Sequence, residues 1–180
     1  MTGQLSGCFE AFRPIEAERN LVLTQLEGWS AERLRFRPTP KAWSAIEVLD
    51  HVVRAETGTI ADVQAGLQNP RILGSELRPR VEELDRALRS EQFFLVPAGA
   101  EAIHPDAQTT WPQVVLRWQH ARTEARSLLE GLTPAHACCG VFCHPFAGWM
   151  TVHEVLEHFS AHLCHHRFQL RRIRAAWEGQ

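Results

Sequence analysis

The chain has 180 residues, of which 44% are hydrophobic and 22% charged, values that are typical of a globular domain with a sizeable core. Its formal net charge of -2 argues against a nucleic-acid-binding surface, and no apolar run approaches the ~20 residues of a membrane span. The N-terminus shows no secretory signal and the five cysteines lack the spacing of a disulfide framework. We therefore expect one domain over residues 1–180, with free thiols in a reducing cytoplasm.

Two amphipathic helices are predicted in the first part of the chain. Apolar residues recur at helical spacing over residues 14–28, with the proline in the first turn. Residues 30–42 contain two prolines and indicate a connection. The second helix begins at Ser44, which forms a capping box with Glu47, and extends to about residue 67. It carries His51 near the edge of its apolar face, where a lone histidine is usually structural.

A long connection, residues 69–109, separates the second and third long helices. It contains four prolines and one short predicted helix, residues 79–89. The third long helix starts with a capping box at Thr110 and ends near residue 131. A connection of this length can cross a helical bundle, so the helices that it joins need not be antiparallel neighbours.

The loop before the last helix is rich in cysteine. It contains Cys138, Cys139 and Cys143, with His136 and His144 nearby. Two adjacent cysteines do not match the C-x₂-C spacing of structural zinc loops. The spacing therefore favours free thiols in a packed loop over a second metal site, and it assigns no role to the three cysteines.

The last stretch, residues 150–174, holds five of the ten histidines. Thr151 and Glu154 form a third capping box, and apolar residues follow at steps of three and four, which predicts a helix with one buried face. His162 and His166 are one turn apart on that face, with Cβ atoms roughly 6 Å from each other. Because two buried imidazoles need polar partners and divalent metals bind imidazole nitrogen, the pair indicates a metal site.

These elements predict an all-α fold, a four-helix bundle with a long connection between its second and third helices. Facing helices of such bundles commonly build metal sites in the interior. Two histidines hold a metal weakly, so a third ligand is expected from elsewhere in the chain. His51 is the best-placed candidate to join His162 and His166.

Two segments carry a resemblance to the DinB-like (YfiT-like) family of metalloenzymes. They are W-S-A-I-E-V-L-D-H-V, residues 43–52, and the stretch 144–170, which contains an H-x-x-H-H-R-x-Q pattern typical of that family. The residues that match this pattern are His162, His165, His166, Arg167 and Gln169. Phe168 stands where many members have glycine. The similarity spans most of the chain.

The resemblance implies an up-down-down-up four-helix bundle, often a homodimer, that acts on a small molecule. It also implies a divalent metal, zinc or nickel, held by His51, His162 and His166. His158 and His165 lie near the same face, so either could replace one of the three ligands or support them, and they are the candidate catalytic residues for proton transfer. Related proteins use low-molecular-weight thiols such as bacillithiol or mycothiol, which implies a thiol S-transferase.

Three functional classes remain open at this point. The first is a metal-dependent enzyme, a thiol S-transferase or a hydrolase. The second is a non-catalytic metal-binding or stress-response protein, and the third is a bundle whose core histidines hold no metal. A fully enclosed metal favours the second class, whereas an open coordination position that faces a pocket favours the first.

Overall fold

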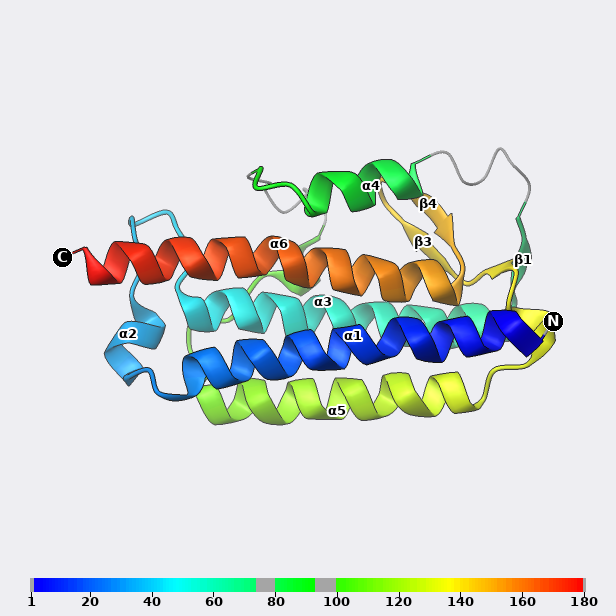
Figure 1. The fold of residues 1–180 in the computed structure, drawn as a ribbon, viewed down its shortest axis with the longest axis horizontal. Coiled ribbons are helices and arrows are strands. Elements are labelled where there is room, and N and C mark those ends of the chain that lie inside the picture. Colours follow the sequence, from blue (N-terminus) through cyan, green and yellow to red (C-terminus); the bar gives the residue numbers. More distant parts are fainter. Residues whose placement is uncertain (1, 74–79, 93–99, 180) are drawn as a thin grey trace.

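Four long helices lie side by side in the computed structural model of the protein (Figure 1). They are α1 (Thr2–Glu27), α3 (Ala45–Gln68), α5 (Trp111–Glu130) and α6 (Val152–Glu178). α1 and α6 run in one direction along the molecule, and α3 and α5 run in the other. The structure describes residues 2–73, 80–92 and 100–179, and the predicted all-α class is confirmed for them.

Each predicted capping box is present. At Ser44, Thr110 and Thr151, the backbone N–H donates to the side chain three residues later over 2.8–2.9 Å. These bonds provide hydrogen-bond partners for backbone N–H groups at the start of each helix, which have no partner within the helix itself. Helices α3, α5 and α6 therefore each begin one residue after the predicted cap.

The first helix differs from its prediction. The expected start at Pro14 is wrong, because α1 begins at Thr2 and contains Pro14 in its interior. A proline inside a helix removes a hydrogen bond and costs about 3 kcal/mol. Cys8, Phe12 and Ile15 are all buried in the core, at 3%, 5% and 0% exposure. The burial of these apolar side chains on either side of the proline offsets that cost and extends the helix.

Several short elements complete the fold. The helical ones are α2 (Ala31–Arg35), α4 (Val81–Leu88), η2 (Glu101–Ile103) and η3 (Pro134–His136). Strand β1 (Arg71–Ile72) pairs antiparallel with β2 (Cys139–Gly140), and β3 (Phe142–His144) pairs antiparallel with β4 (Gly148–Met150). Neither α2 nor the strands were predicted, because elements of two to five residues show no periodicity.

The short helix α4 matches the prediction over residues 79–89, although residue 79 itself lies outside the described residues. It packs against α6, on the side of α6 that faces away from α1 and α5 (Figure 1).

The core contains a buried ion pair as well as apolar side chains. The Arg122 guanidinium of α5 donates to the Glu56 carboxylate of α3 over 2.7 Å, and Trp118 Nε1 donates to the same carboxylate over 2.8 Å. Further along α3, the backbone of Gly66 approaches the chain before α6 so closely that a Cβ would lie 1.8 Å from the Val141 carbonyl oxygen.

No helix in the described part of the chain combines the length and apolar character needed to cross a membrane.

Candidate metal centre

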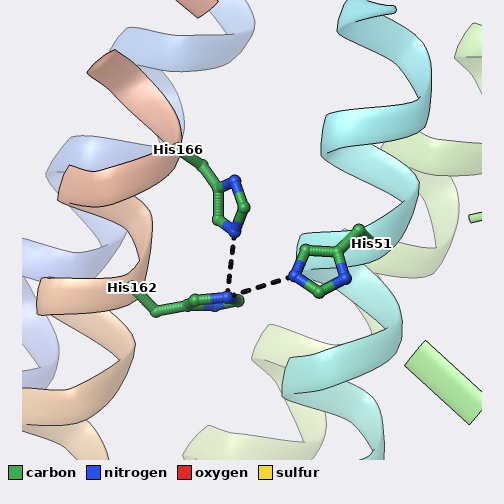
Figure 2. Close-up of side chains that lie close together, drawn as sticks. All are labelled: His51, His162 and His166. Atoms are coloured by element: carbon green, nitrogen blue, oxygen red, sulfur yellow. Dashed lines mark hydrogen bonds between the residues drawn. The ribbon is translucent and has the colours of Figure 1, made fainter. Parts of the chain in front are cut away.

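The three predicted ligands come together between α3 and α6 (Figure 2). His51 projects from α3, and His162 and His166 project from successive turns of α6. The Nε2 atom of His162 lies 3.3 Å from Nε2 of His51 and 2.9 Å from Nε2 of His166. Within the described ranges, these are the one group of three or more His, Cys, Asp or Glu side chains whose ligand atoms all lie within 4.8 Å of one another.

In His51 and His166, a hydrogen bond at Nδ1 determines that Nε2 is the nitrogen facing the other histidines. The Nδ1 atom of His51 lies 2.8 Å from the Ile103 carbonyl oxygen, and a carbonyl only accepts, so Nδ1 carries the proton. Nδ1 of His166 likewise donates to the Gln169 side-chain oxygen over 3.0 Å. In both neutral rings Nε2 is therefore left with a free lone pair that points at the shared centre.

The donor set fits a divalent cation. Two nitrogens bound to one ion at about 2.05 Å lie about 2.9 Å apart at a right angle and about 3.3 Å apart near the tetrahedral angle. The separations around His162 match these values. A single N–H on His162 Nε2 could serve only one of the two facing lone pairs well, whereas a cation satisfies all three nitrogens at once.

Burial keeps the three rings neutral. It lowers the pKa of His51 below its ordinary value of 6.5 and lowers the pKa values of His162 and His166 well below it. For the two α6 histidines, the neighbouring imidazoles lower the pKa further, because a charge on one ring opposes a charge on the next. Neutral imidazole is the form that binds a metal ion, so no proton has to be displaced from these rings near pH 7.

The match to known families agrees with this centre. A model of the DinB superfamily matches residues 15–170, which include all three histidines. The chain belongs to the DinB superfamily. The resemblance inferred from the two sequence motifs is thereby confirmed. No curated protein and no solved structure matches the sequence.

In this DinB-superfamily chain, His158 lies one turn before the ligand pair. Its ring stacks on that of His162, with centroids 5.7 Å apart and planes inclined by 19°. Burial, followed by the nearby His144, lowers the pKa of His158 to about 3. Within the described part of the chain, its Nδ1 atom is buried and has no hydrogen-bond partner. His158 is therefore a neutral ring held directly beside a predicted metal ligand.

His165, the other candidate catalytic residue, occupies a different position. Its side chain is buried, and its ring centroid lies 5.0 Å from that of His166. Burial is the largest cause that lowers its pKa, and the charge of Arg172 contributes. Unlike His158, it does not line the cavity beside the centre. The structure thus brings both residues next to a predicted ligand, and of the two it is His158 that lines the cavity.

A cavity of about 790 Å³ lies between α4 and α6, a size that is typical of small-molecule sites. On the α6 side, Glu154 and His158 line it, one helical turn apart. His162 is the next residue in this row, because residues four apart share one helical face. It is also the one ligand of the three that is partly exposed. The cavity therefore ends at His158, one helical turn of α6 before His162.

The group that orients His51 was not predicted from the sequence, because Ile103 contributes only a backbone carbonyl, which no side-chain pattern reveals. The five cysteines are free thiols in the structure, and none belongs to the three-histidine group.

Proposed function

We propose that this DinB-superfamily protein is a metal-dependent enzyme that transfers a low-molecular-weight thiol to a small electrophile. The observation that carries the metal part is the convergence of three Nε2 lone pairs, two of them fixed by hydrogen bonds to Ile103 and Gln169. His51, His162 and His166 would hold the ion. A three-nitrogen set suits zinc or nickel better than magnesium or calcium, which prefer oxygen.

The choice of an enzyme over a purely structural metal rests on access. A structural zinc has four protein ligands, whereas a catalytic one keeps a position open for water or substrate. The partly exposed His162, next in line to the cavity floor, supports an open position. The choice of a thiol over water rests on the family resemblance of the motif at residues 162–169.

The chemistry would require little from the chain beyond positioning. When bound, the cation supplies positive charge that favours thiolate over thiol near neutral pH. The transfer forms one carbon–sulfur bond, breaks the bond between that carbon and its leaving group, and releases the thiol proton to water. We assign His158 a hydrogen bond that orients the substrate, because it lines the cavity and its ring is neutral. His165 lies beside His166 and away from the cavity, so we propose that it supports that ligand and does not transfer a proton to the substrate.

We also propose a helix topology, a cellular location and an oligomeric state for the protein. In Figure 1, α1 and α6 run in one direction and α3 and α5 in the other, which supports an up-down-down-up four-helix bundle. Following the family resemblance, we propose a cytoplasmic homodimer that acts on a small molecule and does not bind nucleic acid.

The test begins with metal analysis of protein purified without a nickel column. We expect about one zinc or nickel ion per chain, and a loss of it in His166→Ala. The matched control is His120→Ala, because His120 is exposed on α5 and lies outside the centre. Cobalt-substituted protein is then titrated with bacillithiol, mycothiol or glutathione, and conjugation to a chlorinated or epoxide electrophile is measured.

A thiol-dependent change in the cobalt spectrum, with conjugation above the uncatalysed rate, supports the transferase. A metal-loaded protein that shows neither response rejects the thiol reaction and leaves metal-assisted hydrolysis or a structural ion. A protein that takes up no divalent ion rejects the proposal as a whole.

A further inference from the structure

Asp50, the residue before His51 in α3, is completely buried, with 0% of its surface exposed. Its carboxylate accepts hydrogen bonds from Arg54 Nε over 2.8 Å, from the backbone N–H of Asp106 over 2.7 Å and from the Arg117 guanidinium. A buried carboxylate is costly unless its oxygens are paired in this way. The three donors come from α3, from the segment before α5 and from α5, so Asp50 ties these parts of the chain together.

The segment that Asp50 holds is the one that orients His51. Residues 103–106 pass beside α3, with the Ile103 carbonyl against His51 Nδ1 at 2.8 Å and the Asp106 N–H against Asp50 at 2.7 Å. Asp50 and His51, which are adjacent in α3, thus contact two residues of the same segment, Asp106 and Ile103. Movement of that segment would withdraw the carbonyl from His51.

Further contacts hold the end of the segment in place. Arg117 donates to Thr109 Oγ1 over 3.3 Å as well as to Asp50. From the opposite side, Arg35 donates to the carbonyl oxygens of Ala107 and Thr109 over 2.8 Å and 3.1 Å. These bonds act at residues 107–109, whereas the bond to Asp50 acts at Asp106, nearer to Ile103. The Ile103 N–H also donates to the Ala100 carbonyl over 3.2 Å within η2, so Asp50 ties this turn to α3.

We propose that Asp50 is a positioning residue of the metal centre, which holds the Ile103 carbonyl where it keeps the proton of His51 on Nδ1. Nε2 of His51 is then the nitrogen with the lone pair, facing His162 and His166. Without the anchor, neutral imidazole redistributes between its two tautomers, and the form with the proton on Nε2 cannot bind the ion through that atom. The consequence for metal affinity rests on the proposed function, but the consequence for the tautomer does not.

The test uses Asp50→Asn, which keeps the shape of the side chain and removes its charge. Long-range proton–nitrogen NMR on metal-free protein reports which nitrogen of His51 carries the proton. We expect Nδ1–H in the natural protein and a mixture of tautomers in the variant. Zinc affinity, measured by competition with a chromophoric chelator, should fall by about 10-fold or more, as is usual when the partners of a ligand are lost.

A matched control is available at the end of α6. Glu178 also accepts from two arginines, Arg174 at 2.9 Å and Arg33 at 2.8 Å, but is the last residue of α6, about three turns beyond His166. Glu178→Gln should leave both the His51 tautomer and the zinc affinity unchanged. Circular dichroism establishes that each variant is folded. If Asp50→Asn does not fold, Arg117→Met removes one charged partner of Asp50 at a partly exposed position and should produce the same changes to a smaller extent.

The outcomes separate this proposal from the function on which it rests. A folded Asp50→Asn that keeps the Nδ1–H tautomer overturns the positioning role, even if zinc binding weakens. A shift of tautomer with unchanged zinc affinity overturns the link to the metal. If the natural protein binds no divalent ion, the proposed function fails, and the NMR comparison alone decides whether Asp50 orients His51.

Discussion

Replacement of His162 by alanine is the sharpest test of how the metal and the fold depend on each other. His162 Nε2 lies 2.9 Å from Nε2 of His166 and 3.3 Å from Nε2 of His51. It is thus the nitrogen that links α6 to α3 at the centre. Removing it leaves two ligands on different helices, so we expect the ion to bind much more weakly while the core is retained.

The size of the effect follows from linkage between binding and folding. An ion at 100 times its dissociation constant stabilises the folded state by about 2.7 kcal/mol. If the loss of one of three ligands weakens binding about 100-fold, the same ion concentration stabilises the variant by only about 0.4 kcal/mol. The difference corresponds to about 5–9 °C in the melting temperature of a domain of this length.

The assay is thermal unfolding of both proteins, each with a chelator and with excess zinc. Comparing each protein with itself removes any effect of the substitution on the metal-free fold. We expect zinc to raise the melting temperature of the natural protein and to leave that of His162→Ala nearly unchanged. His120→Ala, an exposed histidine on α5, should respond to zinc like the natural protein. An equal zinc response in His162→Ala refutes the assignment of His162 as a ligand.

Three further predictions concern the scaffold. Arg122→Met should lower the free energy of unfolding in urea titrations by about 3–5 kcal/mol, because the Glu56 carboxylate is left buried without its charged partner. A second substitution, Glu56→Gln, should restore much of this loss. Gly66→Ala should destabilise the protein by more than about 2 kcal/mol, because the new Cβ would lie 1.8 Å from a carbonyl oxygen. Gly58→Ala in the same helix places a Cβ with no atom within 4 Å, so it should stabilise the protein by about 0.5–1 kcal/mol. Burial lowers the pKa of His144 below 6.5, so the unfolded chain binds this proton more readily than the folded one and metal-free stability should fall as the pH drops below 6.5. A His144→Gln variant with the same slope between pH 6.5 and 5 contradicts that reasoning, as does an unchanged urea midpoint in Arg122→Met or Gly66→Ala.

The long helices and the two ligands on α6 could be predicted because the signals for them are local. A capping box needs only two residues three apart, and Ser44, Thr110 and Thr151 each begin a helix as expected. The pairing of His162 with His166 follows from one turn of helix. Even the choice of His51 as the third residue required only that it lie near the apolar face of its helix.

Tertiary packing decided the rest. Pro14 reads as a helix start in isolation, but the burial of Phe12 and Ile15 on the core extends α1 across it. Strands β1 and β2 form only because residues 71–72 meet residues 139–140, and β3 and β4 are the two short arms of a local hairpin. Strands of two or three residues carry no recognisable alternation in the sequence.

The sequence by itself determined which residues are able to hold a metal, because ligand chemistry belongs to the side chain and helical spacing is set by the local chain. Only the tertiary structure decided that His51 reaches the pair and which of its nitrogens faces the centre. The first depends on the packing of α3 against α6. The second depends on a segment about fifty residues away in the chain, where the Ile103 carbonyl accepts a hydrogen bond from Nδ1 and the Asp106 N–H donates to Asp50. A hydrogen bond between remote backbone and side-chain atoms leaves no pattern in a linear sequence, since its partners are brought together only by the packing of the helices that carry them.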